Sequence, residues 1–85
     1  MSEIELGRVT HYFSHEGVAA VEIVRDHIEI GDVIHVKGHT SDFTQQVEAM
    51  DSGGQPVREA HVGQSVGIHT DENARVHDVV YKIVP

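Results

Sequence analysis

Most apolar residues of this sequence are branched at Cβ. Its 85 residues include 14 valines and 7 isoleucines, but one leucine and 5 alanines. Side chains branched at Cβ lose rotamer freedom in a helix and pack well on a pleated sheet. This composition therefore predicts an all-β fold and excludes a helical bundle.

The length allows one domain. Eighty-five residues are about half of a typical domain, so we expect residues 1–85 to form a single unit, with its strands between about residues 6 and 84. A chain of this size buries only about 60–65% of the surface that it exposes when unfolded. The core is therefore expected to be thin, without a deep active site.

Alternating apolar and polar residues predict six strands. These cover residues 6–13, 18–24, 33–37, 43–50, 66–70 and 79–84. No segment with the 3.6-residue period of a helix competes with them. Short strands at this spacing indicate a closed antiparallel barrel or a sandwich, and closure removes the exposed edges that aggregate. Phe13 and Phe43 are expected in the core, because the chain has few other large apolar side chains.

The segments between the strands are rich in turn residues. Residues 14–17 predict a turn with Gly17 at positive φ, residues 25–27 a polar break and residues 51–56 a loop. Residues 57–62 predict a short turn or a single helical turn. His77 stands where two similar segments carry glycine. Since histidine tolerates positive φ better than most residues, we expect that turn to survive.

The excess of acidic residues limits the possible partners. Six Lys and Arg against 14 Asp and Glu give a net charge of −8, which disfavours RNA because its phosphates are bound by clustered basic side chains. No apolar stretch reaches the roughly 18 residues of a membrane span, and the first residues lack the pattern of a signal peptide. The chain has no cysteine, so disulfides and a thiolate nucleophile are excluded. We expect a cytoplasmic protein that binds another protein and no membrane.

Six short motifs follow one another along the chain. They are GRVT at 7–10, IGD at 30–32, VIHVKG at 33–38, VEAM at 47–50, VGQSVGI at 62–68 and DVVYK at 78–82. In this order they resemble the second domain of translational GTPases such as elongation factor Tu, and small stand-alone elongation-factor-like proteins. A related barrel is appended to some collagenase-like peptidases. The resemblance covers residues 6–84 and implies a closed six-stranded antiparallel β-barrel.

The resemblance also implies a function. Glu48 matches a glutamate beside the pocket for the terminal adenosine of tRNA, and Arg8 matches a basic residue near that pocket. No phosphate-binding motif Gly-x-x-x-x-Gly-Lys-Ser/Thr occurs in the sequence, so we expect no GTP binding. The expected role is a non-catalytic adaptor that binds a protein in the translation or RNA-modification machinery. An RNA- or tRNA-contacting module is the alternative, and a His-based metal-binding protein or enzyme is the third.

Eight histidines raise the question of a metal site. His35 and His39 are four residues apart, which on a straight strand separates them by about 13 Å, too far for one ion. A bend at Gly38 would be needed to bring them together. We therefore expect no metal or cofactor, with His35 and His39 as the candidate ligands if a metal binds.

Overall fold

The computed structural model describes residues 2–85 and contains ten β-strands. They are β1 (Ser2–Phe13), β2 (Val18–Ile23), β3 (His27–Glu29), β4 (Val33–Lys37), β5 (Asp42–Gln46), β6 (Met50–Ser52), β7 (Gln55–Val57), β8 (Glu59–His61), β9 (Ser65–His69) and β10 (Val79–Val84). The predicted all-β class is therefore confirmed. Within these 84 residues no helix is long and apolar enough to cross a membrane.

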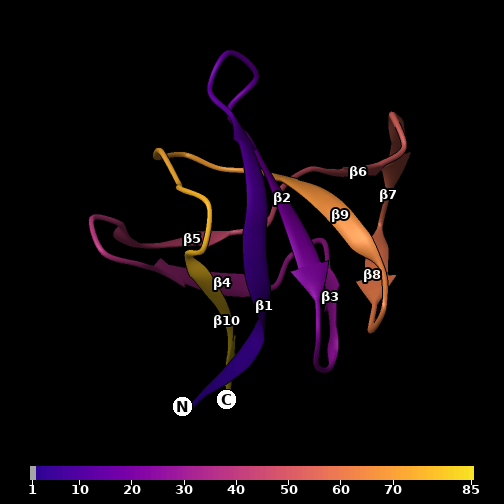
Figure 1. The fold of residues 1–85 in the computed structure, drawn as a ribbon. Coiled ribbons are helices and arrows are strands. Elements are labelled where there is room, and N and C mark those ends of the chain that lie inside the picture. Colours follow the sequence, from indigo (N-terminus) through magenta and orange to yellow (C-terminus); the bar gives the residue numbers. More distant parts are fainter. Residues whose placement is uncertain (1) are drawn as a thin grey trace.

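The strands form two sheets, and every pairing is antiparallel. Eight strands follow the order β5-β4-β10-β1-β2-β9-β6-β7, and β3 pairs with β8 in a separate two-stranded sheet. β4 and β5 run across the direction of β1, so the large sheet is strongly curled (Figure 1). Ser2 lies opposite Val84 in the β1–β10 pair, which places the two ends of the described chain side by side.

The predicted closed six-stranded barrel is wrong. β5 and β7 are the outer strands of the large sheet, and within residues 2–85 they do not pair with each other. Residues 43–50 were expected as one strand, but Val47 leaves it. The Val47 N–H donates to the Asp32 carbonyl at 2.8 Å, and the Val47 carbonyl accepts from the Gly31 N–H at 2.9 Å. β5 therefore ends at Gln46, and the chain continues into β6, which pairs with β9 instead of closing the sheet.

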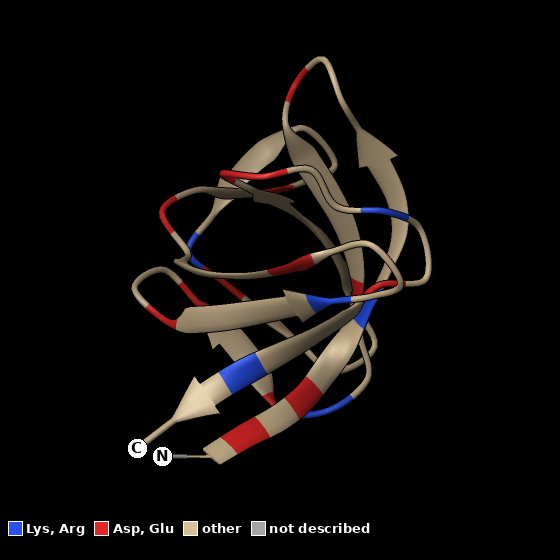
Figure 2. Ribbon diagram, turned by 90° about the vertical axis from the view of Figure 1, so that its left-hand side faces the viewer, with Lys and Arg blue, Asp and Glu red and all other residues tan. Residues whose placement is uncertain are grey.

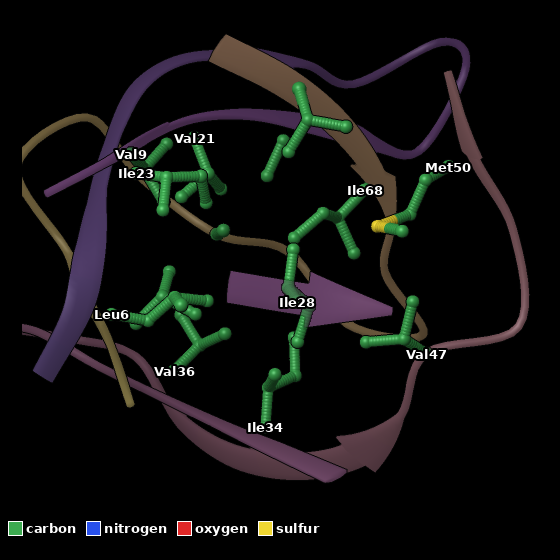
Figure 3. Close-up of a cluster of buried hydrophobic side chains, with 14 of the residues drawn as sticks. Leu6, Val9, Val21, Ile23, Ile28, Ile34, Val36, Val47, Met50 and Ile68 are labelled. Carbon is green, nitrogen blue, oxygen red and sulfur yellow. The ribbon is translucent and has the colours of Figure 1, made fainter. Parts of the chain in front are cut away.

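One cluster of buried apolar side chains fills the inside of the curled sheet. It draws residues from the large sheet and from both strands of the small one, which contribute Ile28 and Ala60. Figure 3 shows Ile28 in the middle of the labelled side chains, between Ile34 and Ile68. The small sheet thus packs its two buried side chains against the inner face of the large sheet.

A partly buried lysine also holds the small sheet in place. Lys82 of β10 has a side chain that is 10% exposed, and its Nζ donates to the His27 carbonyl of β3 at 3.0 Å. The carboxylates of Asp26 and Asp32 lie 3.8 and 3.6 Å from the same Nζ. The ammonium group is therefore surrounded by oxygen atoms at both ends of β3.

Two β-bulges in β1 change which side chains face the core. Leu6 interrupts the pairing with β10, and Thr10 interrupts the pairing with β2. Such an extra residue reverses the alternation of inward and outward side chains beyond it. As a result Tyr12 packs against the core and Phe13 is 48% exposed. The prediction of a buried Phe13 is wrong, whereas that of a buried Phe43 is confirmed.

The turns agree better with the sequence than the short strands do. Gly17 and His77 both have positive φ, of 67° and 79°, which confirms the turns expected there. The polar break at residues 25–27 instead leads directly into β3, and the expected turn at 57–62 contains β8. Three-residue strands are too short for their alternation to be recognised in a sequence.

Candidate functional site

A shallow groove crosses the outer face of the large sheet over β2, β9 and β6. It has a volume of about 480 Å³. The hairpin that joins β1 to β2 borders it with Phe13 and Glu16, and the tight turn between β6 and β7 borders it with Gly53 and Gly54. Ligand-binding sites are mostly apolar with a few placed polar groups, and the lining of this groove has that composition.

The strand register explains why the sheet is hollowed here. His11, Ala20, Gly67, Asp51 and Pro56 lie opposite one another in turn, in a row that runs from β1 to β7. The neighbouring row, which includes Tyr12, packs on the core, so this row faces outward. Ala20 and Gly67 are the smallest residues of this row, and the sheet is hollowed where they lie.

Gly67 lies close to the side chains of Asp51 and Val18. A Cβ at this position would lie 2.5 Å from Asp51 Oδ1 and 3.0 Å from Val18 Cγ1. Any side chain at residue 67 would therefore push the Asp51 carboxylate away from the sheet. Glycine lets that carboxylate lie against the backbone of β9.

Asp51 carries an unsatisfied oxygen atom. Its Oδ1 is buried and has no hydrogen-bond partner within the described part of the chain, although the residue as a whole is half-buried. A buried acceptor without a donor costs about 1–3 kcal/mol, and more when it is charged. A positively charged donor on the exposed side of this carboxylate would offset part of that cost.

The groove is acidic as well as hollow. Glu16 and Asp51 line it together with the hydroxyl groups of Ser52 and Ser65, and none of its lining residues, all within 2–85, is Lys or Arg. Figure 2 shows Asp and Glu spread over the strands and connections, with Lys and Arg scattered singly among them. A positively charged ligand therefore fits this surface better than an anionic one.

The residues expected to contact tRNA lie elsewhere. Arg8 is exposed on β1, opposite Glu22 of β2 and Val79 of β10. Glu48 is exposed in the connection between β5 and β6. Neither lines the groove. Their binding role stays a prediction.

The two candidate metal ligands have different surroundings. His39 is exposed in the turn after β4. His35 has a side chain that is 16% exposed, and both of its ring nitrogens face carboxylates: Nδ1 lies 3.0 Å from Glu3 Oε2 and Nε2 lies 2.6 Å from Asp42 Oδ1. Within residues 2–85 no three His, Asp or Glu side chains are grouped to hold a metal ion. Their role as metal ligands stays a prediction.

These carboxylates make His35 a source of pH-dependent stability. The hydrogen bond to Asp42 raises the pKa of His35 above its usual 6.5, with a further increase from Glu3 and an opposing effect of burial. The same bond lowers the pKa of Asp42. Lys37 lies near Asp42, and the Tyr81 ring packs against His35. The ion pair therefore stabilises the fold between the lowered pKa of Asp42 and the raised pKa of His35, and is lost above the latter.

We expect the free energy of unfolding to fall as the pH rises from 6 to 9, and to fall less in His35→Gln. Urea unfolding followed by circular dichroism at each pH measures this. His15→Gln is the matched control, because His15 is exposed in the turn after β1. Parallel curves for the wild type and His35→Gln would contradict the assignment.

Comparison with known proteins identifies relatives that are peptidases. No protein-family model matches the chain. It is 36% identical over 81 residues to a collagenase of Porphyromonas gingivalis, and 32% identical over 80 residues to an uncharacterized protease of Methanocaldococcus jannaschii. These matches cover 94% and 93% of this chain but 20% and 19% of the relatives. The chain thus spans about a fifth of their length.

The similar solved structures are also parts of a peptidase. Two structures of the C-terminal domain of a U32 peptidase from Geobacillus thermoleovorans superpose with TM-scores of 0.83 and 0.84, at 25% and 26% identity. They cover 91% and 96% of this chain, which in turn covers 96% and 93% of theirs. The chain is therefore similar to this domain over nearly its full length.

These relatives correct three expectations. The elongation-factor resemblance is wrong as an assignment, because the relatives are peptidases and C-terminal domains of U32 peptidases. The expected adaptor role in translation or RNA modification is wrong for the same reason. The expectation of a protein that is not an enzyme is overturned by relatives named collagenase and protease. The related domain of collagenase-like peptidases, named above beside that resemblance, is of the kind that these comparisons find.

Reasoning from the sequence missed the groove residues. Asp51, Gly53 and Gly54 were read as a loop, and Gly67 as an ordinary position in a strand. The signal that was present is the pair of small outward residues, Ala20 and Gly67, in strands otherwise rich in valine and isoleucine.

Proposed function

We propose that this chain works in a peptidase system of the U32 type, in the place of the C-terminal domain, and binds the protein that is to be cleaved. The observation that supports this most is the match, over more than nine-tenths of the chain, in both sequence and fold to proteins of this one type. This chain matches only about a fifth of each relative, so the proposal concerns binding and not the cleavage step.

The groove over β2, β9 and β6 suits an extended peptide. Its floor is formed by small and apolar side chains, including Val18 and Ala20, and hydroxyl and carboxylate groups border it. Apolar contact with a few placed polar groups is the usual composition of a ligand-binding site. The net charge of −8 also favours a protein ligand over RNA.

Denatured collagen is the probe that the relatives suggest, since two of them are collagenases. We expect gelatin peptides, added to the isotopically labelled chain, to shift the amide signals of Ala20, Ser52 and Gly67 most strongly. Ala20→Leu fills the middle of the groove, so we expect it to weaken binding at least about tenfold, or about 1.4 kcal/mol.

The matched control is Thr44→Leu, which adds the same side chain at an exposed position of β5, outside this groove. It is expected to bind gelatin peptides as the wild type does. Absence of any signal change with gelatin, or changes confined to residues outside the groove, would contradict the proposal.

The cytoplasmic location is also proposed. A chain without cysteine is suited to a reducing compartment, where disulfides do not form. Fractionation of the native cells with an antibody against the chain tests it, and recovery from the medium would contradict it.

A further inference from the structure

We propose that the groove selects a peptide segment with a basic side chain, Lys or Arg, which Asp51 binds. This inference rests on the proposed function, because it takes the ligand of the groove to be a peptide. It adds the chemical class of side chain that is recognised.

The first argument is the condition of Asp51. Its Oδ1 lies against β9 opposite Gly67 without a hydrogen-bond donor, so close that a side chain at position 67 would displace it. Oδ1 itself is buried, but the residue as a whole keeps some exposed surface, so a ligand in the groove reaches the carboxylate on its exposed side. A guanidinium or ammonium group has several N–H donors and binds a carboxylate through short, charge-assisted bonds.

The second argument is the absence of a competing cation. Glu16 is the other charged residue that lines the groove, and the lining residues, all among the described ones, include no Lys or Arg. Two carboxylates without a neutralising partner create a negative potential in a recess with apolar walls. Such a recess attracts cations and repels acidic segments.

The third argument is the aromatic border. Phe13 is 48% exposed on the outer face, where its ring stacks on His11 at a centroid distance of 6.1 Å. Lys and Arg have long apolar stems that pack on such rings, and their charged ends interact favourably with aromatic faces. The combination of an apolar wall and an acidic end matches a side chain with an apolar stem and a cationic tip.

A pair of peptides tests the inference directly. A collagen-derived peptide that contains one arginine is compared with the same peptide containing citrulline, which keeps the shape and loses the charge. We expect the wild-type chain to bind the arginine peptide at least about tenfold more tightly, the scale of a charge-assisted hydrogen bond. The preference should decrease as salt is added, because the carboxylates border an open groove.

Three variants test which carboxylate binds the arginine side chain. Asp51→Asn is expected to reduce the arginine-to-citrulline ratio to about one, and Glu16→Gln to reduce it less. The matched control Glu5→Gln removes the same charge from an exposed position on β1 outside the groove, so it should keep the wild-type ratio. Amide spectra establish that each variant is folded.

The outcomes separate the two proposals. If both peptides bind the wild-type groove equally, charge selection is overturned while peptide binding stands. If a preference for arginine persists in Asp51→Asn, the assignment to Asp51 is overturned. If neither peptide binds, the proposed function fails and the inference fails with it.

Discussion

Replacing Gly7 with alanine is expected to destabilise the chain by at least about 3 kcal/mol, the upper end of the usual cost of overpacking. Gly7 is buried in β1, between Ile23 of β2 and Val80 of β10. A Cβ there would lie 1.9 Å from the Glu22 backbone oxygen. Backbone atoms cannot rotate away as a flexible side chain can, so β1 and β2 must separate. These are the two central strands of the large sheet.

A chain of this length has a total stability of only about 4–13 kcal/mol, so this substitution removes a large share of it. Each kcal/mol lowers the melting temperature by about 4–8 °C at this size, and we expect a decrease of more than about 12 °C by circular dichroism. Gly53→Ala is the control. It has positive φ but nothing within 4 Å of its Cβ position, so it should cost about 1 kcal/mol. Equal melting temperatures for the two variants would contradict the steric argument.

Replacing Ile28 with alanine is expected to lower the free energy of unfolding by about 3 kcal/mol, the second large effect that we predict. Ile28 has no exposed surface and lies in the middle of the core (Figure 3). Its strand, β3, pairs only with β8 among the described strands. The small sheet contacts the large one through this side chain, its partner Ala60 and Lys82. Backbone hydrogen bonds of Ile23 with Gly63 and Gln64 add to these contacts just beyond the end of β8.

Ile28→Ala is expected to lower the local stability of the small sheet as well as the free energy of unfolding of the whole chain. Hydrogen exchange at the amides of β3 and β8 should accelerate more than exchange in β1, because the cavity lies under the small sheet. Val24→Ala, at a position that is 45% exposed, is expected to stay within about 0.5 kcal/mol of the wild type. A uniform acceleration over both sheets would show that Ile28 does not attach the small sheet in particular.

Two strands, β4 and β10, were predictable to the residue because their alternation is unbroken. Residues 33–37 and 79–84 match β4 and β10 at both ends. The buried residues alternate with more exposed ones, namely Ile34 and Val36 in β4 and Val80 and Lys82 in β10, and Val36 lies opposite Val80. Here local pattern and tertiary packing agree, so the sequence is sufficient.

The failures arise where the backbone departs from a regular strand. The bulge at Thr10 turns Phe13 outward, and the alternation of apolar and polar residues in β1 does not predict this bulge. The hydrogen bonds of Val47 to the turn at residues 31–32 end β5 early and leave the sheet open. Both features depend on pairing with another segment of the chain, so the residue pattern of one segment does not predict them.

The candidate site was hidden for the same reason. Asp51 lies beside Gly67 only because β6 pairs with β9, and the groove opens only because Ala20 is opposite Gly67 on the other side. Each of these residues is unremarkable along the sequence. Their chemistry arises from a register across three strands that are distant in sequence.

The pairing of Ser2 with Val84 has an engineering consequence. Two backbones joined in one ladder are about 5 Å apart, so a bridge of a few residues would connect them into a ring. The β6–β7 turn at Gly53 and Gly54 would then serve as the place to reopen it. By the same geometry, the unit can be grafted into a surface loop of a host protein without spreading the loop's two anchor points.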